Sequence, residues 1–125
     1  MYDRTNIFAK ILRGEAPSRK VYEDEFALAF HNIHPATPVH VLVIPKGEYI
    51  SNADFSAQAP AELVAGFWRA VGHTARALGL DEPGYRLVAN NGADAHQVVF
   101  HFHVHIIGGR RMSSVSAKPG VEDKT

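Results

Sequence analysis

The spacing of apolar positions changes several times along the chain, and each change predicts a different element. Near the N-terminus, apolar residues at helical spacing follow Asn6 and stop before Gly14, which predicts a short capped helix. From Pro60 onward, apolar residues recur at every third or fourth position up to Gly79, which predicts one long amphipathic helix. Its apolar stripe consists of Leu63, Phe67, Ala70, Val71, Thr74 and Leu78.

Five segments have the short length and the β-branched or aromatic composition of strands. They are residues 20–23, 26–31, 40–45, 86–90 and 99–107. The third is an almost continuous apolar run, as expected of a central strand covered on both faces, and the fifth ends at Gly108 and Gly109. Residues 51–59 are rich in turn formers and predict an irregular connection, and residues 91–97 predict a loop.

The order helix, strands, long helix, strands predicts an α+β domain. We expect a mainly antiparallel sheet of about five strands packed with one long and one short helix. Residues 1–112 are expected to form this domain, because 125 residues with 46% hydrophobic composition suffice for one core but not for two. Residues 113–125 contain few apolar side chains and are expected to form a loosely held C-terminal tail.

Charge and composition narrow the class of protein. The 13 Lys and Arg residues balance the 13 Asp and Glu residues, whereas a nucleic-acid-binding protein normally has a basic excess. The absence of cysteine excludes disulfides and thiolate metal sites. No apolar run approaches the roughly 20 residues of a membrane span, and the N-terminus lacks the apolar core of a signal peptide. We therefore expect a cytoplasmic protein that binds neither nucleic acid nor membrane.

Histidines are concentrated near the end of the chain. Four of the eight fall within ten positions, namely His96, His101, His103 and His105. In a strand alternate side chains share a face, so the last three point to one side. The apolar residues between them point to the other side, toward the long helix; they are Phe102, Val104 and Ile106. Burying three imidazoles side by side is costly unless they are hydrogen-bonded or face a cleft, so the pattern indicates a chemical role.

Three interpretations of this histidine segment compete. The first is a solvated polar face, for which Ser, Thr, Lys or Glu would be commoner. The second is a zinc site, because two histidines two positions apart on a strand can share a metal ion, with His40, His96 or Asp94 as further ligands. The third is a histidine nucleophile. On physical grounds alone, the metal site and the nucleophile are nearly even.

A family resemblance separates these interpretations. Residues 101–107 resemble the His-φ-His-φ-His-φ-φ signature of the histidine triad (HIT) superfamily, in which φ is apolar. The continuation Gly108-Gly109-Arg110 resembles the Hint branch, the purine nucleoside phosphoramidases, rather than the diadenosine-polyphosphate hydrolases. The likeness covers residues 6–112 in the same order, including the segments 6–11, 29–33 and 38–46.

The resemblance implies a role for each histidine. His103 is the expected nucleophile, which attacks phosphorus as a neutral imidazole, displaces the amine and forms a nucleotidyl-histidine that water then hydrolyses. His105 is expected to hold the phosphate oxygens and, when protonated, to offset charge in the transition state. His101 and His40 are expected to orient the nucleophile. The scheme needs no metal and no cofactor.

The resemblance also implies a nucleotide pocket and a homodimer. The base is expected between apolar residues and the ribose and phosphate beside polar ones; the residues are Phe8, Ile11, Ile33, Leu42, Asn32, Asn90, Gln97 and Val98. Packing in the core, or capping of a loop by Asn90 and Gln97, is the alternative for these positions. Phe67, Trp68 and the sheet edge are the expected sources of apolar area for a dimer contact.

Three departures from the family pattern stand out. Asn32 replaces the usual Asp at the ribose position, so it lacks a charged acceptor for two hydroxyls. His96-Gln97-Val98 replaces Gly-Gln-Ser, so the hydroxyl near the leaving group is missing, and His96 is an alternative proton donor. The tail has no aromatic residue where Hint proteins carry a Trp; Trp68 is the single Trp of the chain.

Together these observations predict an enzyme that hydrolyses nucleoside 5′-phosphoramidates, such as AMP or GMP amines and aminoacyl or lysyl adducts of AMP. The expected partner is a purine nucleotide. The alternatives are a dinucleoside-polyphosphate hydrolase or nucleotidyl transferase of the same fold, a nucleotide-binding interaction module with vestigial activity, and a zinc protein.

Overall fold

The structure, a computed structural model, describes residues 1–114. The helices are α1 (Ile7–Leu12), α2 (Asn52–Gln58) and α3 (Ala61–Ala77), with a 3-10 turn η1 (Ala93–Ala95). The strands are β1 (Lys20–Glu23), β2 (Ala27–His31), β3 (Val39–Pro45), β4 (Arg86–Val88) and β5 (Val104–Gly108). They form one antiparallel sheet in the order β1-β2-β3-β5-β4, so the predicted α+β fold is confirmed. No helix in the described range is long and apolar enough to cross a bilayer.

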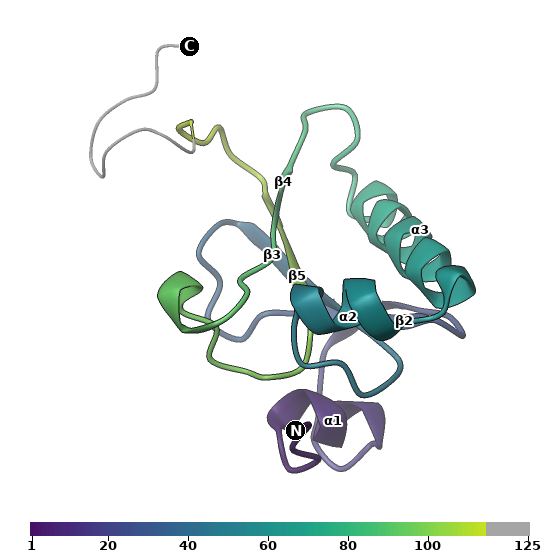
Figure 1. The fold of residues 1–125 in the computed structure, drawn as a ribbon. Coiled ribbons are helices and arrows are strands. Elements are labelled where there is room, and N and C mark those ends of the chain that lie inside the picture. The colour runs from purple at the N-terminus through teal and green to yellow at the C-terminus, as the bar shows by residue number, and fades with distance from the viewer. Residues whose placement is uncertain (115–125) are drawn as a thin grey trace.

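The two faces of the sheet pack against different helices (Figure 1). On β2, Ala27 and Ala29 face α3, whereas Leu28 and Phe30 face the other side, where Phe8 of α1 meets them. Strands β3 and β5 alternate in the same way and add to the α3 side Val41, Val43, Val104 and Ile106. The period of two along each strand therefore divides the interior into a main core under α3 and a smaller cluster under α1.

Helix α3 buries the stripe that its spacing predicts. Phe67, Ala70, Val71 and Thr74 are buried, and Thr74 donates its hydroxyl hydrogen to the carbonyl of Ala70 at 2.7 Å. Because Phe67 is completely buried, the expectation that it contributes to a dimer contact is wrong. Its neighbour Trp68 is 41% exposed and remains available for such a contact.

The prediction of an irregular connection at 51–59 is wrong, because α2 occupies most of it. Ser51 caps this helix by accepting a hydrogen bond from the amide of Asp54. Only Phe55 is buried, and its ring stacks on that of Phe102 with the centroids 4.8 Å apart. A seven-residue helix with a single buried side chain leaves too short an apolar pattern to distinguish it from a turn.

The last strand starts later than the sequence predicts, at Val104 instead of residue 99. Its partner β3 ends at Pro45, which has no amide hydrogen to extend the ladder. The amide of Phe102 donates instead to the carbonyl of Tyr49 at 2.7 Å. The predicted alternation still continues upstream of the strand, since Phe102 is buried in the core under α3. From residue 115 onward, the predicted C-terminal tail lies outside the described residues.

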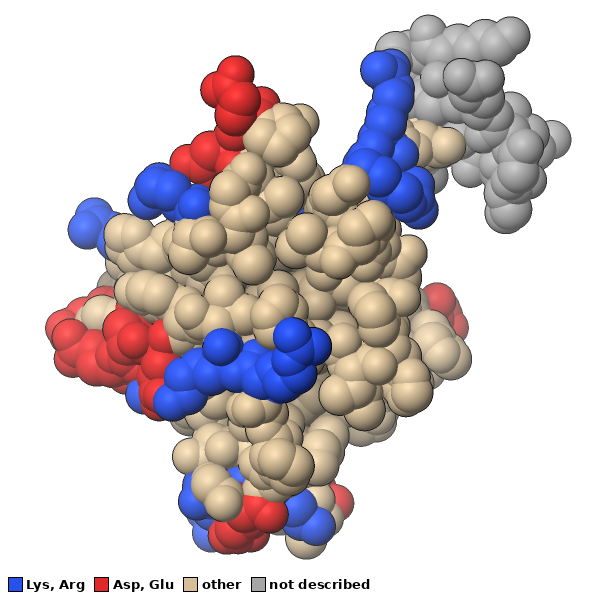
Figure 2. Space-filling model, turned by 180° about the vertical axis from the view of Figure 1, so that it is seen from behind, with Lys and Arg blue, Asp and Glu red and all other residues tan. Residues whose placement is uncertain are grey.

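Charged side chains do not gather in one region of the face shown in Figure 2. Acidic and basic residues are interspersed around a broad uncharged area. Several form ion pairs, including Arg4 with Glu48 and Lys46 with Glu23. All of these pairs are at least partly exposed, so each contributes little to stability.

Two glycines of α3 provide a matched test of the packing between this helix and the sheet. A Cβ on Gly66 would lie 2.3 Å from the ring of Phe26, whereas a Cβ on Gly72 would meet nothing within 4 Å. We expect Gly66→Ala to lower the free energy of unfolding by about 1–3 kcal/mol, because the Phe26 ring must move. Gly72→Ala should raise it by about 0.5–1 kcal/mol through helix propensity. Urea unfolding of both variants checks this, and equal stabilities would contradict the predicted clash.

Candidate active site

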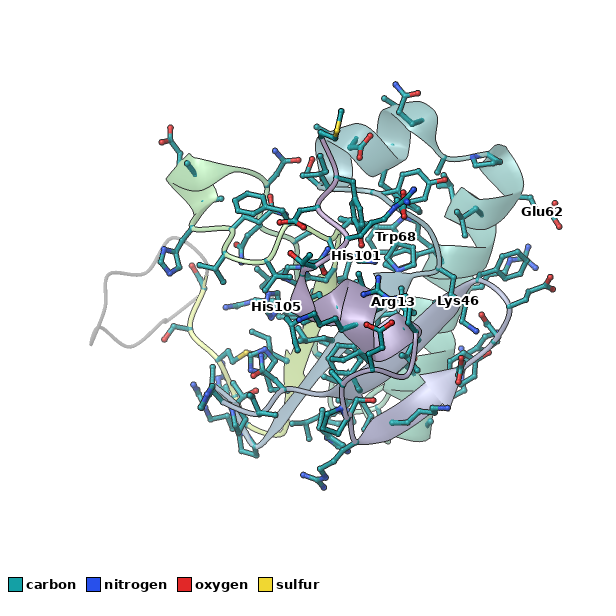
Figure 3. The ribbon with its side chains drawn as sticks, turned by 90° about the horizontal axis from the view of Figure 1, so that it is seen from below. Arg13, Lys46, Glu62, Trp68, His101 and His105 are labelled. Atoms are coloured by element: carbon teal, nitrogen blue, oxygen red, sulfur yellow. The ribbon has the colours of Figure 1, made fainter. Side chains whose placement is uncertain are left out.

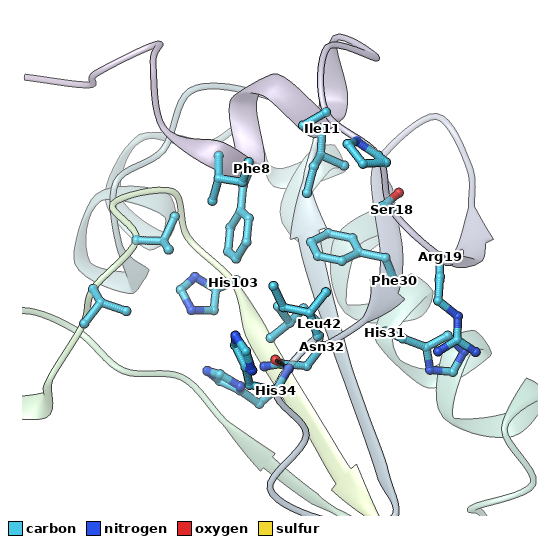
Figure 4. A pocket seen from close by; sticks show the side chains of 17 residues that line it. Phe8, Ile11, Ser18, Arg19, Phe30, His31, Asn32, His34, Leu42 and His103 are labelled. Atoms are coloured by element: carbon cyan, nitrogen blue, oxygen red, sulfur yellow. Dashed lines mark hydrogen bonds between the residues drawn. The ribbon is translucent and has the colours of Figure 1, made fainter.

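An open cavity of about 500 Å³ lies on the α1 side of the sheet (Figure 4). Apolar side chains form most of its wall, and among them are Phe8, Ile11, Phe30, Leu42, Val98 and Val99. His103 and His105 also line it. This volume and this mixture of apolar wall and a few polar groups are typical of sites for small molecules.

The register of three neighbouring strands places residues of the cavity wall side by side. Phe30 on β2 pairs with Leu42 on β3, and Leu42 pairs with His105 on β5. Phe8 of α1 covers this row, with its ring edge-to-face to Phe30 at 5.5 Å and to His103 at 5.0 Å. Three neighbouring strands and one helix therefore hold the apolar wall against the histidines.

A hydrogen bond fixes the tautomer of His103, and burial keeps the ring neutral. Its Nδ1 lies 2.7 Å from the carbonyl oxygen of His101, which can only accept, so Nδ1 carries the hydrogen. Burial lowers the pKa of His103 below its ordinary value, and the His101 carbonyl opposes this only in part. The ring is therefore neutral at pH 7, with the lone pair on Nε2.

His101 does not line the cavity and is completely buried. Figure 3 shows it near the middle of the molecule. Its Nε2 donates to the carbonyl oxygen of Pro45 at 3.0 Å, which leaves Nδ1 as an acceptor for the hydroxyl of Tyr2. Burial lowers the pKa of His101 to about 4. Both nitrogens of this neutral ring are thus occupied by fixed partners, as expected of an orienting residue.

His40 and His105 form a second pair. The amide of Ala36 donates to Nδ1 of His40 at 2.9 Å, so a neutral His40 carries its hydrogen on Nε2. That Nε2 lies 2.9 Å from Nδ1 of His105, which must accept and therefore carries its own hydrogen on Nε2. His40 thereby fixes His105 as a hydrogen-bond donor.

In the unliganded site, burial favours the neutral form of His105. Burial, together with the neighbouring His103 and His40, lowers the pKa of His105 to about 4. Burial also lowers the pKa of His40. Both rings are neutral at pH 7, so His105 offers a phosphate one N–H donor and no positive charge.

Asn32 presents mainly its amide nitrogen to a ligand. Its Oδ1 accepts from the amide of His34 at 2.8 Å, and its Nδ2 lies 3.3 Å from Nε2 of His40. Since His40 Nε2 already carries a hydrogen aimed at His105, two donors face each other and this contact is not a hydrogen bond. The side chain lines the cavity beside His34 (Figure 4).

The predicted site residues divide into two groups. Those that line the cavity are Phe8, Ile11, Asn32, Ile33, Leu42, Val98, His103 and His105; those that do not are His40, His101, Asn90 and Gln97. The Gln97 side chain bonds to backbone groups of Gly92, Ile50 and Val99, so it caps its loop. His96 is exposed and adopts a left-handed conformation with φ of 60°.

Two residues of the site are missing from the sequence prediction: Phe30, which lines the cavity, and Tyr2, which contacts His101. Phe30 could have been found, because it shares a strand face with Leu28 and lies two positions before Asn32. Tyr2 had no such signal, because its contact with His101 spans 99 residues. Within residues 1–114, no group of three His, Cys, Asp or Glu side chains is arranged to hold a metal ion.

Comparison with known proteins agrees with this geometry. The sequence model of the HIT domain family matches residues 13–112 of this chain. A 13.2 kDa HIT-like protein of Azospirillum brasilense is 54% identical over 117 residues, which cover 94% of this chain and 96% of that protein. A HIT family hydrolase from Clostridium thermocellum superposes with a TM-score of 0.82 at 41% identity, over 92% of this chain and 99% of that one.

A HIT family hydrolase from Legionella pneumophila gives a TM-score of 0.81 at 40% identity, over 87% of this chain and 96% of that one. The similarity thus extends over nearly the whole length of each protein and includes the segments that carry the histidines. The chain therefore belongs to the HIT family, with the fold and the histidine cluster of a hydrolase-like enzyme.

Proposed function

We propose that this protein hydrolyses nucleoside 5′-phosphoramidates through a covalent nucleotidyl-His103 intermediate, as in the Hint branch. The observation that carries the proposal is the hydrogen bond from His103 Nδ1 to the His101 carbonyl, which leaves the Nε2 lone pair on a neutral ring that lines the cavity. A neutral imidazole nitrogen with a fixed direction is what nucleophilic attack at phosphorus requires.

In the proposed reaction, the lone pair of His103 Nε2 forms a bond to phosphorus as the phosphorus–nitrogen bond to the amine breaks. The departing nitrogen keeps that bonding pair and takes a proton from water. A second displacement by water breaks the bond between phosphorus and His103 and releases the nucleoside monophosphate. Throughout, the Nε2 hydrogen of His105 bonds to a phosphoryl oxygen.

The apolar part of the cavity suits a purine base. Phe8, Phe30 and Leu42 form one continuous apolar surface under α1, and Ile11 packs against it. Ile33 is 85% exposed, so in this proposal it lies at the mouth rather than against the base on all sides. The ribose would then lie beside Asn32, between the base and the two histidines.

A nucleotide-binding module with vestigial activity is the second candidate. Val98 is 68% exposed at the cavity and offers no hydroxyl to a leaving group, and Asn32 offers no carboxylate to the ribose. Both features would lower the rate of turnover more than they would lower the affinity for the base. Dinucleoside polyphosphates are the alternative substrates.

A homodimer is also part of the proposal. Trp68 on α3 and Leu87 on the edge strand β4 are 41% and 42% exposed, and large apolar side chains at such positions are common in protein contacts. Strand β4 ends the sheet order, and in this proposal its outer edge pairs with a strand of the second copy.

Replacing the nucleophile gives the most direct test. With a fluorogenic adenosine phosphoramidate, we expect His103→Ala to lower kcat by at least about 10³-fold, because the covalent route is lost. His73→Ala, a histidine on the outer side of α3, serves as the control and should retain wild-type kcat. Turnover should survive a chelator such as EDTA. Loss of activity on chelation would favour a metal site, and tight nucleotide binding without turnover would favour the binding module.

The acid side of the pH profile tests the state of the nucleophile. Because burial lowers the pKa of His103, the ring takes up its proton only below the ordinary histidine value of about 6.5. We expect kcat/KM to stay level as pH falls through 6.5 and to decline only at more acidic pH. A blank without enzyme corrects for acid hydrolysis, and circular dichroism at each pH confirms folding. A midpoint at or above 6.5 would contradict a buried, neutral nucleophile.

The ribose contact is tested by Asn32→Asp. A carboxylate accepts hydrogen bonds from ribose hydroxyls more strongly than an amide, so we expect nucleoside monophosphates to bind roughly fivefold more tightly. Isothermal titration with AMP measures this, and 2′,3′-dideoxy-AMP is the matched control ligand that should show no gain. An unchanged affinity for AMP, or an equal gain for the dideoxy ligand, would refute the contact.

A further inference from the structure

Tyr2 contacts the histidine cluster from the N-terminal segment without lining the cavity. Its hydroxyl bonds to Nδ1 of His101, and the two rings meet edge-to-face with centroids 5.6 Å apart. His101 is completely buried. Among the described residues, Tyr2 is the residue that donates a hydrogen bond to its Nδ1. The contact joins the second residue of the chain to the segment that carries the proposed nucleophile.

Among residues 1–114, the Tyr2 hydroxyl is the donor that satisfies Nδ1 of His101. The hydrogen of His101 is committed to the carbonyl of Pro45, so Nδ1 needs a donor from elsewhere. Burial lowers the pKa of His101 to about 4, so at neutral pH the ring does not take up a second proton instead. Without the hydroxyl, a buried acceptor would be left unpaired, and the ring would shift toward other partners.

The position of residue 101 matters because few bonds fix the backbone there. Strand β5 begins at Val104, so residues 101–103 lie outside the ladder. The backbone is held by the bond from the Phe102 amide to Tyr49, and the side chain of His101 is held between Tyr2 and Pro45. The His101 carbonyl accepts from His103 Nδ1 at 2.7 Å, so movement of residue 101 moves the group that sets the tautomer of His103.

The N-terminal segment is itself held in place. Arg4 pairs with Glu48 at 2.6 Å, and the Asn6 side chain donates to the carbonyl of Asp3 at 2.8 Å while capping α1. Glu48 directly precedes Tyr49, whose carbonyl holds the Phe102 amide. Tyr2 therefore reaches His101 from a segment tied to the same loop that supports residues 101–103.

We infer that Tyr2 is a positioning residue for His103: its hydroxyl fixes the His101 ring, and the His101 carbonyl in turn keeps the hydrogen of His103 on Nδ1. The inference rests on the proposed function, in which Nε2 of His103 must carry a lone pair. If the His101 carbonyl is displaced, His103 populates the other tautomer, whose Nε2 carries a hydrogen and cannot attack phosphorus.

Tyr2→Phe removes the hydroxyl and keeps the ring. We expect kcat for the adenosine phosphoramidate to fall about 10- to 100-fold with little change in KM, because the nucleophile is misaligned while the base pocket is intact. In ligand-free protein, ¹⁵N NMR of the imidazoles should show His103 moving from the Nδ1-protonated form to a mixture of tautomers. Tyr22→Phe is the matched control: it removes the hydroxyl that bonds Asp24 at 2.9 Å in the β1–β2 hairpin, and should change neither measurement.

The NMR measurement separates this inference from the proposed function, because it needs no substrate. Should wild-type protein fail to turn over phosphoramidates, a tautomer change in Tyr2→Phe would still support the role of Tyr2. An unchanged His103 tautomer overturns the inference, whether or not kcat falls, because a fall would then reflect a general structural effect. Urea unfolding of each variant ensures that all measurements are made on folded protein.

Discussion

The hydrogen bond from His103 to the carbonyl of His101 is the constraint on which the site depends. A backbone carbonyl oxygen can only accept and a backbone N–H can only donate, so each backbone partner dictates which imidazole nitrogen carries the hydrogen. The Pro45 carbonyl does this for His101, and the Ala36 amide does it for His40. Many enzymes orient a histidine with a carboxylate, which also stabilises its cation. Backbone partners fix the tautomer of each histidine without adding a negative charge that would stabilise its cation. Burial can therefore keep the histidines neutral.

Core packing and site geometry share one segment of chain. Phe102, Val104 and Ile106 are buried under α3, and their spacing fixes the side of the chain on which the intervening histidines emerge. Pro45 contributes twice, since it ends β3 and so frees residues 101–103 from the ladder, and its carbonyl then receives His101. A change in the core under Phe102 would therefore reach the histidines through the backbone, without any contact with the cavity.

The sequence predicts the parts of this arrangement that depend on local pattern. Phe102 points to the opposite side of the chain from His101 and His103 even though β5 begins only at Val104. Burial of the Phe102 ring in the core determines which side chains face which way. The parts that depend on distant partners escape prediction. Gln97 is a loop cap because Gly92, Ile50 and Val99 happen to surround it, and Tyr2 meets His101 across 99 residues. Helix α2 is not predicted because Phe55 is its one buried side chain, which leaves no apolar pattern at helical spacing.

The tautomers also restrict where protons can go in the proposed reaction. A cationic His105 would need a hydrogen on Nδ1, which lies 2.9 Å from Nε2 of His40 and faces the hydrogen that this nitrogen carries. His40 cannot turn that hydrogen away by moving it to Nδ1, because Nδ1 already receives the amide of Ala36. The pair therefore resists an additional proton for geometric reasons as well as through burial. In the proposed reaction, His105 would consequently act as a neutral donor to the phosphate.

In the proposed reaction, Val98 offers no hydroxyl, so the departing nitrogen would take its proton from water or arrive protonated. Such a site favours substrates whose leaving nitrogen is basic enough to be protonated before the bond to phosphorus is fully broken. Alkyl amines meet this condition better than weakly basic aromatic amines do. Under the proposed function, the choice among leaving groups would therefore follow from the arrangement of His40, His105 and Val98, rather than from the proposed nucleophile His103.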